Sequence, residues 1–356
     1  MARDEGITAL SRKPLEVAFL FDDHAYSFSD VLVVGALRGE WSPFIARTRG
    51  RRRQSDDPPP PAAAEEVVAF RRARRLEAAS DLRAWLGERG LDEKDLVCHA
   101  LALARERAGS LPSSSGSVGG HPRSTADWWP EAVLSGDIER WAAVLERWVT
   151  ASHIGADVAA GGDGPDAAGE EYADRVAALI DAIRESGVLV VAYAADERRI
   201  EILARACLDY QIWAASAVAG PAIDRLIGRK RLGWTWLEYD AVIFKSESAA
   251  WEAALCVRED GERLEDVAAR ADAPVVRRSG RRQDLRLAQD SILMALAPGE
   301  VGGPVITDDE PILLQLRQAV APAARDDEVR QLARAELIDA SLAVAAAGRT
   351  RRVGTW

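Results

Sequence analysis

The chain has 356 residues, more than one ordinary domain holds, so we expect two or three folded units. Asp and Glu (57) outnumber Lys and Arg (46), and the formal net charge of −11 argues against a general nucleic-acid binder. No stretch approaches the roughly 18 consecutive apolar residues that cross a membrane. The three cysteines are far apart, which predicts free thiols. With no apolar leader visible at the N-terminus, the sequence predicts a cytoplasmic protein.

The first region, residues 1–108, is predicted to be a short strand followed by helices. LEVAFLF at 15–21 has the pattern of a strand. Ser27, three residues before Asp30, is typical of a helix start at which each side chain caps the other's backbone N–H. The run GRRRQSDDPPPPAAA at 50–64 predicts an exposed Pro-rich loop, because four prolines beside an arginine run do not pack. Helical patterns with Gly stops then predict an all-helical region.

The middle of the chain is predicted to be a linker and a second helical region. GSLPSSSGSVGGHPRS at 109–124 has the composition of a flexible linker. Amphipathic helical patterns fill most of 125–235. VLVVAYAA within that region fits a buried strand or the start of a helix, and periodicity does not distinguish the two.

The last third predicts a small α+β unit at 236–322 and a C-terminal helix at 323–356. WLEYDAVIF reads as a strand, three short helical patterns follow, and GPVIT with PILLQLRQAV reads as a strand pair. This order favours an antiparallel sheet with helices beside it. The fold class is therefore α+β, mainly helical in its N-terminal region. We expect the C-terminal helix to pack on that N-terminal region through one apolar stripe: Val329, Leu332, Ala333, Leu337 and Leu342.

Four stretches within or beside 236–322 carry a family resemblance. They are DAVIFKSESAAWEA, GERLEDVAARA, ILMALAPGEVGGPV and ITDDEPILLQLRQAV. In this order they resemble the parvulin (PpiC-type) peptidyl-prolyl isomerase domain: its first strand and helix, a helix start, a segment with fixed glycines and a proline, and the closing hairpin. The wider layout resembles the SurA-like chaperones, whose N- and C-terminal helices pack together as a peptide-holding core. The resemblance implies a peptide or unfolded polypeptide as partner. It implies no cofactor and leaves the oligomeric state open.

The sequence departs from the parvulin pattern where catalysis would occur. Active parvulins carry a histidine in the first strand and often a second in the last hairpin, and the matching positions here hold Ala241 and Ile312. Rotating a peptide bond has a barrier of about 18–20 kcal/mol, so a scaffold without its polar groups is predicted to be catalytically degenerate. The resemblance and the chain order give these candidate peptide-binding residues: Phe244, Asp272, Leu285, Met294, Trp234 and Trp236.

Other candidate sites are weaker. The four histidines are scattered without a close pair, which predicts no metal site. Cys98 and His99 are neighbours on a predicted helix and point about 100° apart, which argues against a Cys/His dyad. Two tryptophans that border the linker, Trp128 and Trp129, are candidates for an exposed peptide-binding surface. The arginine run at 70–75 predicts a solvated face or a grip on an acidic peptide.

Three functions remain open from the sequence. The first is a parvulin-derived, SurA-like peptide-binding chaperone or scaffold, with maturation of a ribosomally made peptide as a role implied by the resemblance. The second is an active prolyl isomerase with a rebuilt site. The third is a biosynthetic enzyme of unrelated chemistry on this fold, which a closed pocket with a perturbed acid or histidine would favour.

Overall fold

The computed structural model describes residues 16–52, 61–107, 125–159, 167–189, 196–307 and 310–353. The chain divides into two compact units, residues 1–217 with 340–356 (unit 1) and residues 218–339 (unit 2). The α+β fold class is confirmed, with helices throughout and two small antiparallel sheets. The predicted linker at 109–124, most of the predicted loop at 50–64 and most of VLVVAYAA lie outside the described residues.

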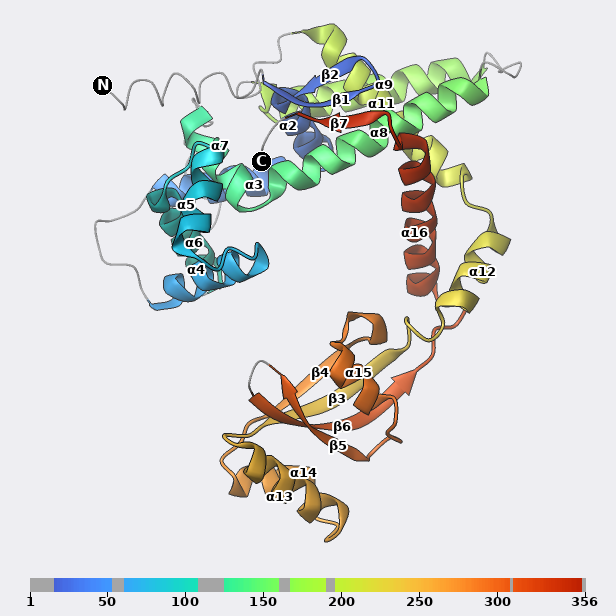
Figure 1. Ribbon diagram of the computed structural model, residues 1–356. Helices are drawn as coiled ribbons and strands as arrows, with labels where there is room; N and C mark the ends of the chain where they lie inside the picture. Colours follow the sequence, from blue (N-terminus) through green and yellow to red (C-terminus); the bar gives the residue numbers. More distant parts are fainter. Residues whose placement is uncertain are drawn as a thin grey trace. The chain divides into compact units, whose positions relative to one another are not determined.

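The sheet of unit 1 joins segments from both ends of the chain (Figure 1). Its strands are β1 (Val17–Phe21), β2 (His24–Ser27) and β7 (Thr350–Arg352), in the order β2-β1-β7 and all antiparallel. The guanidinium of Arg349 also donates to the carboxylate of Asp22, with Nη2 and Oδ2 2.6 Å apart. The sequence did not predict β7, because TRR is short and polar.

Helices form the rest of unit 1. The predicted capping at Ser27 is confirmed: the Asp30 carboxylate accepts from the Ser27 backbone N–H at 2.7 Å, and the Ser27 hydroxyl accepts from that of Asp30. The described helices of this unit are α2 (Phe28–Leu37), α3 (Trp41–Arg52), α4 (Pro61–Ala73), α5 (Ala79–Glu88), α6 (Glu93–Arg107), α7 (Thr125–Leu134), α8 (Asp137–Ala159), α9 (Ala167–Glu185) and α11 (Glu197–Ser216).

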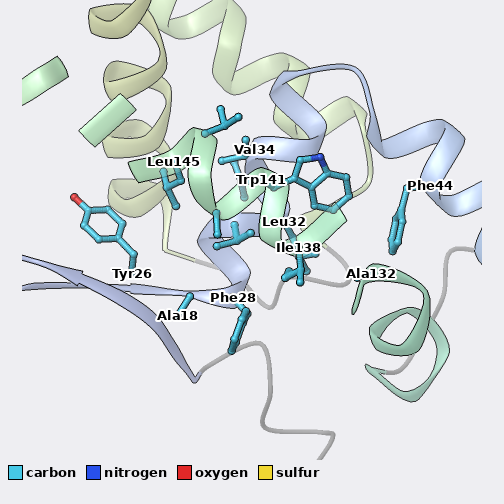
Figure 2. Close-up of a cluster of buried hydrophobic side chains, with 14 of the residues drawn as sticks. Ala18, Tyr26, Phe28, Leu32, Val34, Phe44, Ala132, Ile138, Trp141 and Leu145 are labelled. Atoms are coloured by element: carbon cyan, nitrogen blue, oxygen red, sulfur yellow. The ribbon is translucent and has the colours of Figure 1, made fainter. Parts of the chain in front are cut away.

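The core of unit 1 is built around α2 and α8, with Trp141 at its centre (Figure 2). A Cβ added to Gly35 would lie 2.7 Å from the Trp141 ring, so only glycine lets these two helices approach as they do. Trp128 and Trp129 are fully buried in the same core. The prediction of an exposed tryptophan pair there is wrong, because α7 turns both rings into the helical core.

Unit 2 contains a four-stranded antiparallel sheet in the order β4-β3-β6-β5. Helices α13 and α14 lie on one side of it and α15 on the other (Figure 1). Its described elements are α12 (Gly220–Lys230), β3 (Trp236–Ile243), α13 (Glu247–Arg258), α14 (Leu264–Arg270), β4 (Val275–Arg281), the 3-10 turn η2 (Arg282–Asp284), α15 (Leu287–Leu293), β5 (Val301–Thr307), β6 (Glu310–Val320) and α16 (Asp327–Ala346), which continues into unit 1.

Two features of unit 2 differ from the predictions. The sequence misses β4, because VVRRSGR forms a largely exposed edge strand without alternating apolar residues. The apolar stripe of α16 is predicted to pack on the N-terminal helices. The part of α16 that belongs to unit 2 instead packs on α12 and Trp234, because α12 has an apolar stripe of its own. The contacting side chains are Ile223, Leu226, Ile227, Trp234, Val329, Leu332, Ala333 and Leu337. Among the described residues, no helix has the length and apolar character needed to cross a membrane.

Candidate functional site

The α15 side of the unit 2 sheet is the surface on which a parvulin-like site is expected. Side chains alternate between the two sides of a strand, so β3 presents Ala241 and β6 presents Ile312 to this side. In the strand register Ala241 pairs with Leu314, and Ile243 pairs with Ile312. Ala241 and Ile312 therefore belong to one buried apolar cluster, which Leu293 of α15 covers. The structure thus brings together the two positions, Ala241 and Ile312, at which the parvulin resemblance leads us to expect histidines.

The glycines of the GEVGGPV segment hold α15 close to this cluster. A Cβ on Gly302 would lie 2.3 Å from the Cγ2 of Ile292, so a larger residue would push α15 away from β5. Gly303 has a φ of +102°, which an L side chain rarely adopts. These two positions explain why the segment is glycine-rich.

Two polar side chains lie on the α15 side of the unit 2 sheet or close to it. The sequence did not identify either of them. Tyr239 is a member of the cluster and is 4% exposed, and burial raises the pKa of its phenol. Gln289 is buried on α15, one turn before Leu293 and on the same side of that helix. Within the described part of the chain, the Gln289 side chain forms no hydrogen bond. The helical offset of four residues from Leu293 is the signal that could have identified it.

The predicted peptide-binding residues do not form one site. Leu285 packs against the cluster on the α15 side, but Phe244 is buried on the opposite side among α13 and α14. Trp234 is 2% exposed and packs on α12 and α16. Phe244 and Trp234 are therefore core residues, because the alternation along β3 and the α12 contact turn them inward.

The other predicted residues are exposed. Asp272 follows α14 and pairs with Lys245, with Oδ2 and Nζ 2.9 Å apart, and this hydrogen bond lowers its pKa. It lies beside the α13 and α14 cluster and not on the α15 side. Trp236, at the start of β3, is 37% exposed, and Met294, at the end of α15, is 40% exposed.

Helix α15 also has an exposed apolar side. Leu287 is 85% exposed, and Met294 follows it by seven residues, so both lie on the same side of the helix. This pair, which we call the α15 outer pair, leaves apolar surface in contact with solvent. Such surface is available to an apolar peptide segment.

Unit 1 contains a second candidate site, a pocket of about 460 Å³ between α3, α4, α6 and the α7–α8 connection. We call it the polar pocket. Phe70, Leu103 and Leu134 give it an apolar wall. Its charged and ionisable lining residues are Arg47, Glu66, Arg74, His99, Asp137 and Arg140.

A buried carboxylate orients His99 in the polar pocket. Nδ1 of His99 lies 3.0 Å from Oε2 of Glu131, and Glu131 is fully buried. The other carboxylate oxygen of Glu131 accepts from Nε of Arg47 at 3.4 Å. The sequence places His99 beside Cys98, but its partner is 32 residues away. No short-range pattern could have paired the two.

Cys256, Asp260 and Glu262, around the end of α13, have potential ligand atoms within 4.8 Å of one another. Glu262 also forms an ion pair with Arg270. The sequence did not predict this group of potential metal ligands, because it contains no histidine and only one cysteine.

Comparison with known proteins gives little further information. The chain matches no family model and no curated protein. One similar solved structure is the crystal structure of PrsA from Bacillus subtilis, which is 12% identical. The match covers 61% of this chain and 84% of that chain, with a TM-score of 0.20.

Proposed function

We propose that this chain is a parvulin-derived peptide-binding chaperone or scaffold whose unit 2 holds extended polypeptide without isomerising it. One observation carries the proposal: Ala241 and Ile312 lie in one apolar cluster where the resemblance expects histidines. An apolar cluster excludes water and packs against side chains, but it supplies no charged group to a prolyl peptide bond. Binding is then the activity that this side of the sheet retains.

The exposed surface beside the cluster supports a polypeptide as the partner. The α15 outer pair, Leu287 and Met294, offers apolar contact to a partner's side chains. A polypeptide segment with exposed apolar side chains fits this surface. Location in the cytoplasm and maturation of a ribosomally made peptide stay predictions, and a titration with precursor peptides tests the second.

Acidic substitutions in the α15 outer pair test the proposal in the full chain. We expect Leu287→Asp and Met294→Asp each to weaken binding of an unfolded polypeptide by about tenfold, since burying one large apolar side chain contributes roughly 1.5–3 kcal/mol. Leu255→Asp is the matched control, because Leu255 is 49% exposed on α13, on the other side of the sheet. Equal loss of affinity in all three variants would argue against a site at α15.

An active prolyl isomerase is the second candidate, and a specific observation favours it. The Tyr239 hydroxyl and the Gln289 amide lie on the side of the sheet where the family's polar groups are expected. A hydrogen bond to the rotating amide from either group would lower the barrier. If this function holds, Tyr239→Phe or Gln289→Leu abolishes a measurable acceleration of prolyl isomerisation.

A further inference from the structure

The polar pocket of unit 1 has acidic groups that are already paired. Asp137 accepts from Arg47 and from Arg140, the latter with Oδ1 and Nη2 2.5 Å apart. Glu66, 6% exposed, pairs with Arg107. The carboxylates in the lining are therefore neutralised by arginines of the protein itself.

Arg74 differs from the other arginines of this pocket. Its guanidinium lies over the rings of Phe70 and Trp85, with the central carbon 4.2 Å and 5.2 Å from the ring centroids. Its Nη2 donates to the carbonyl oxygen of Leu134 at 3.3 Å. Across the described residues, Arg74 forms no ion pair. Burial lowers its pKa, which reflects the energetic penalty of a half-buried cation, although the nearby carboxylate of Glu139 opposes this effect.

An anion beside Arg74 would offset that penalty. A guanidinium has five N–H donors in one plane and matches a carboxylate with two parallel hydrogen bonds. The two aromatic rings beneath it restrict its motion, so little side-chain entropy remains to be lost on binding. Arg74 is thus prepared to bind a carboxylate.

His99 supplies the complementary group. In the neutral tautomer of His99 that donates from Nδ1 to the Glu131 carboxylate, Nε2 is an acceptor. Nε2 has no hydrogen-bond partner within the described ranges. A ligand that fits both residues carries a carboxylate and an N–H, and the wall formed by Phe70, Leu103 and Leu134 suits an apolar side chain.

We propose that the polar pocket binds an N-acylated α-amino acid unit with an apolar side chain, held by Arg74 at its carboxylate and by His99 at its N–H. This chemistry occurs in free N-acyl amino acids and in the C-terminal residue of a polypeptide. About 460 Å³ accommodates one such residue and leaves the preceding chain outside. The site is separate from the α15 side of unit 2, so each proposal can fail without the other.

Calorimetric titration of the full chain with matched acid and amide probes tests this proposal. N-acetyl-leucine is compared with N-acetyl-leucinamide, and an acetylated heptapeptide ending in leucine with its C-terminal amide. We expect both acids to bind at least about tenfold more tightly than their amides, because the amide loses the charge-assisted pair with Arg74. If only the peptide acid binds, the ligand of the pocket is the C-terminus of a polypeptide. If both acids bind equally, a free N-acyl amino acid is sufficient as the ligand. Acid and amide binding alike, or neither binding, overturns the proposal.

Two variant pairs locate the site. Arg74→Gln is expected to reduce acid binding by at least about tenfold, whereas Arg72→Gln, an exposed change in the last turn of α4, leaves it unchanged. Ala69→Trp fills the pocket and also reduces binding, whereas Ala64→Trp, exposed on α4 outside the lining, does not. Each variant is compared with wild type by its melting temperature. A loss of binding in the controls equal to that in the pocket variants would contradict the assignment.

Discussion

Ala241 and Ile312 lie on the same side of the unit 2 sheet, in diagonal positions on the paired strands β3 and β6. Ala241 is 2% exposed and Ile312 is 6% exposed, so both positions are closed to water by packing. A histidine at either position would need a polar partner, and this apolar cluster offers few. The packing around both positions therefore favours apolar side chains.

The close approach of α15 to β5 predicts that Gly302→Ala destabilises unit 2. The new methyl group would meet Ile292 at 2.3 Å, and such overpacking reduces the free energy of unfolding by about 1–3 kcal/mol. Urea unfolding monitored by hydrogen exchange in β3 and β6 measures this change. Gly280→Ala is the control, because no atom lies within 4 Å of a Cβ added there. Equal stability of the two variants would mean that α15 does not need the glycine.

Asp240 predicts a second stability effect, on the opposite side of the same sheet. Its buried carboxylate accepts from Nε of Arg317 at 2.6 Å and from Nε of Arg277 at 3.4 Å. Asp240→Asn removes the charge but keeps the volume, so we expect a loss of about 2–4 kcal/mol in the free energy of unfolding. Chemical denaturation measures it. Glu252→Gln, an exposed change on α13, should leave the midpoint unaltered, and a similar shift in both variants would refute the role of Asp240.

Glu40 predicts a pH dependence in unit 1. Burial alone would raise its pKa, but hydrogen bonds from Trp141, Arg38 and Arg140 outweigh burial and lower the pKa to about 2. The folded pKa is below the ordinary value of 4.5, so the contribution of Glu40 to stability is complete above pH 4.5 and is lost as pH falls toward 2.

Glu40→Gln tests this dependence. The variant should be less stable than wild type by about 1–2 kcal/mol at pH 7, and the difference should shrink steadily below pH 4.5. Thermal unfolding across that range measures it, with Glu65→Gln, exposed on α4, as the control. A difference that is independent of pH would show that the charge of Glu40 has no stabilising role.

The sequence predicted elements with strong periodicity and missed those without it. The β5–β6 hairpin and the Ser27 cap of α2 were correct, because turn residues and helix starts are local signals. β4 and β7 are arginine-rich edge strands whose pairing depends on β3 and β1, and such strands have no local apolar pattern.

The candidate site was predicted less well than the fold. Which side of a strand a residue occupies decides its role, and Phe244 and Leu285 were grouped although they lie on opposite sides of the sheet. His99 and Glu131 come from different helices, and their proximity depends on tertiary packing that the sequence does not display. Long-range pairs of this kind were beyond the sequence patterns.

The most direct test of the central claim measures peptide binding and prolyl isomerisation with the same protein. A proline-containing unfolded polypeptide is titrated against the full chain, and cis–trans exchange of its prolyl bond is followed at saturation. We predict saturable binding that weakens in Leu287→Asp, with an exchange rate equal to the uncatalysed one. Accelerated exchange that disappears in Tyr239→Phe or Gln289→Leu would contradict the account, and so would the absence of binding.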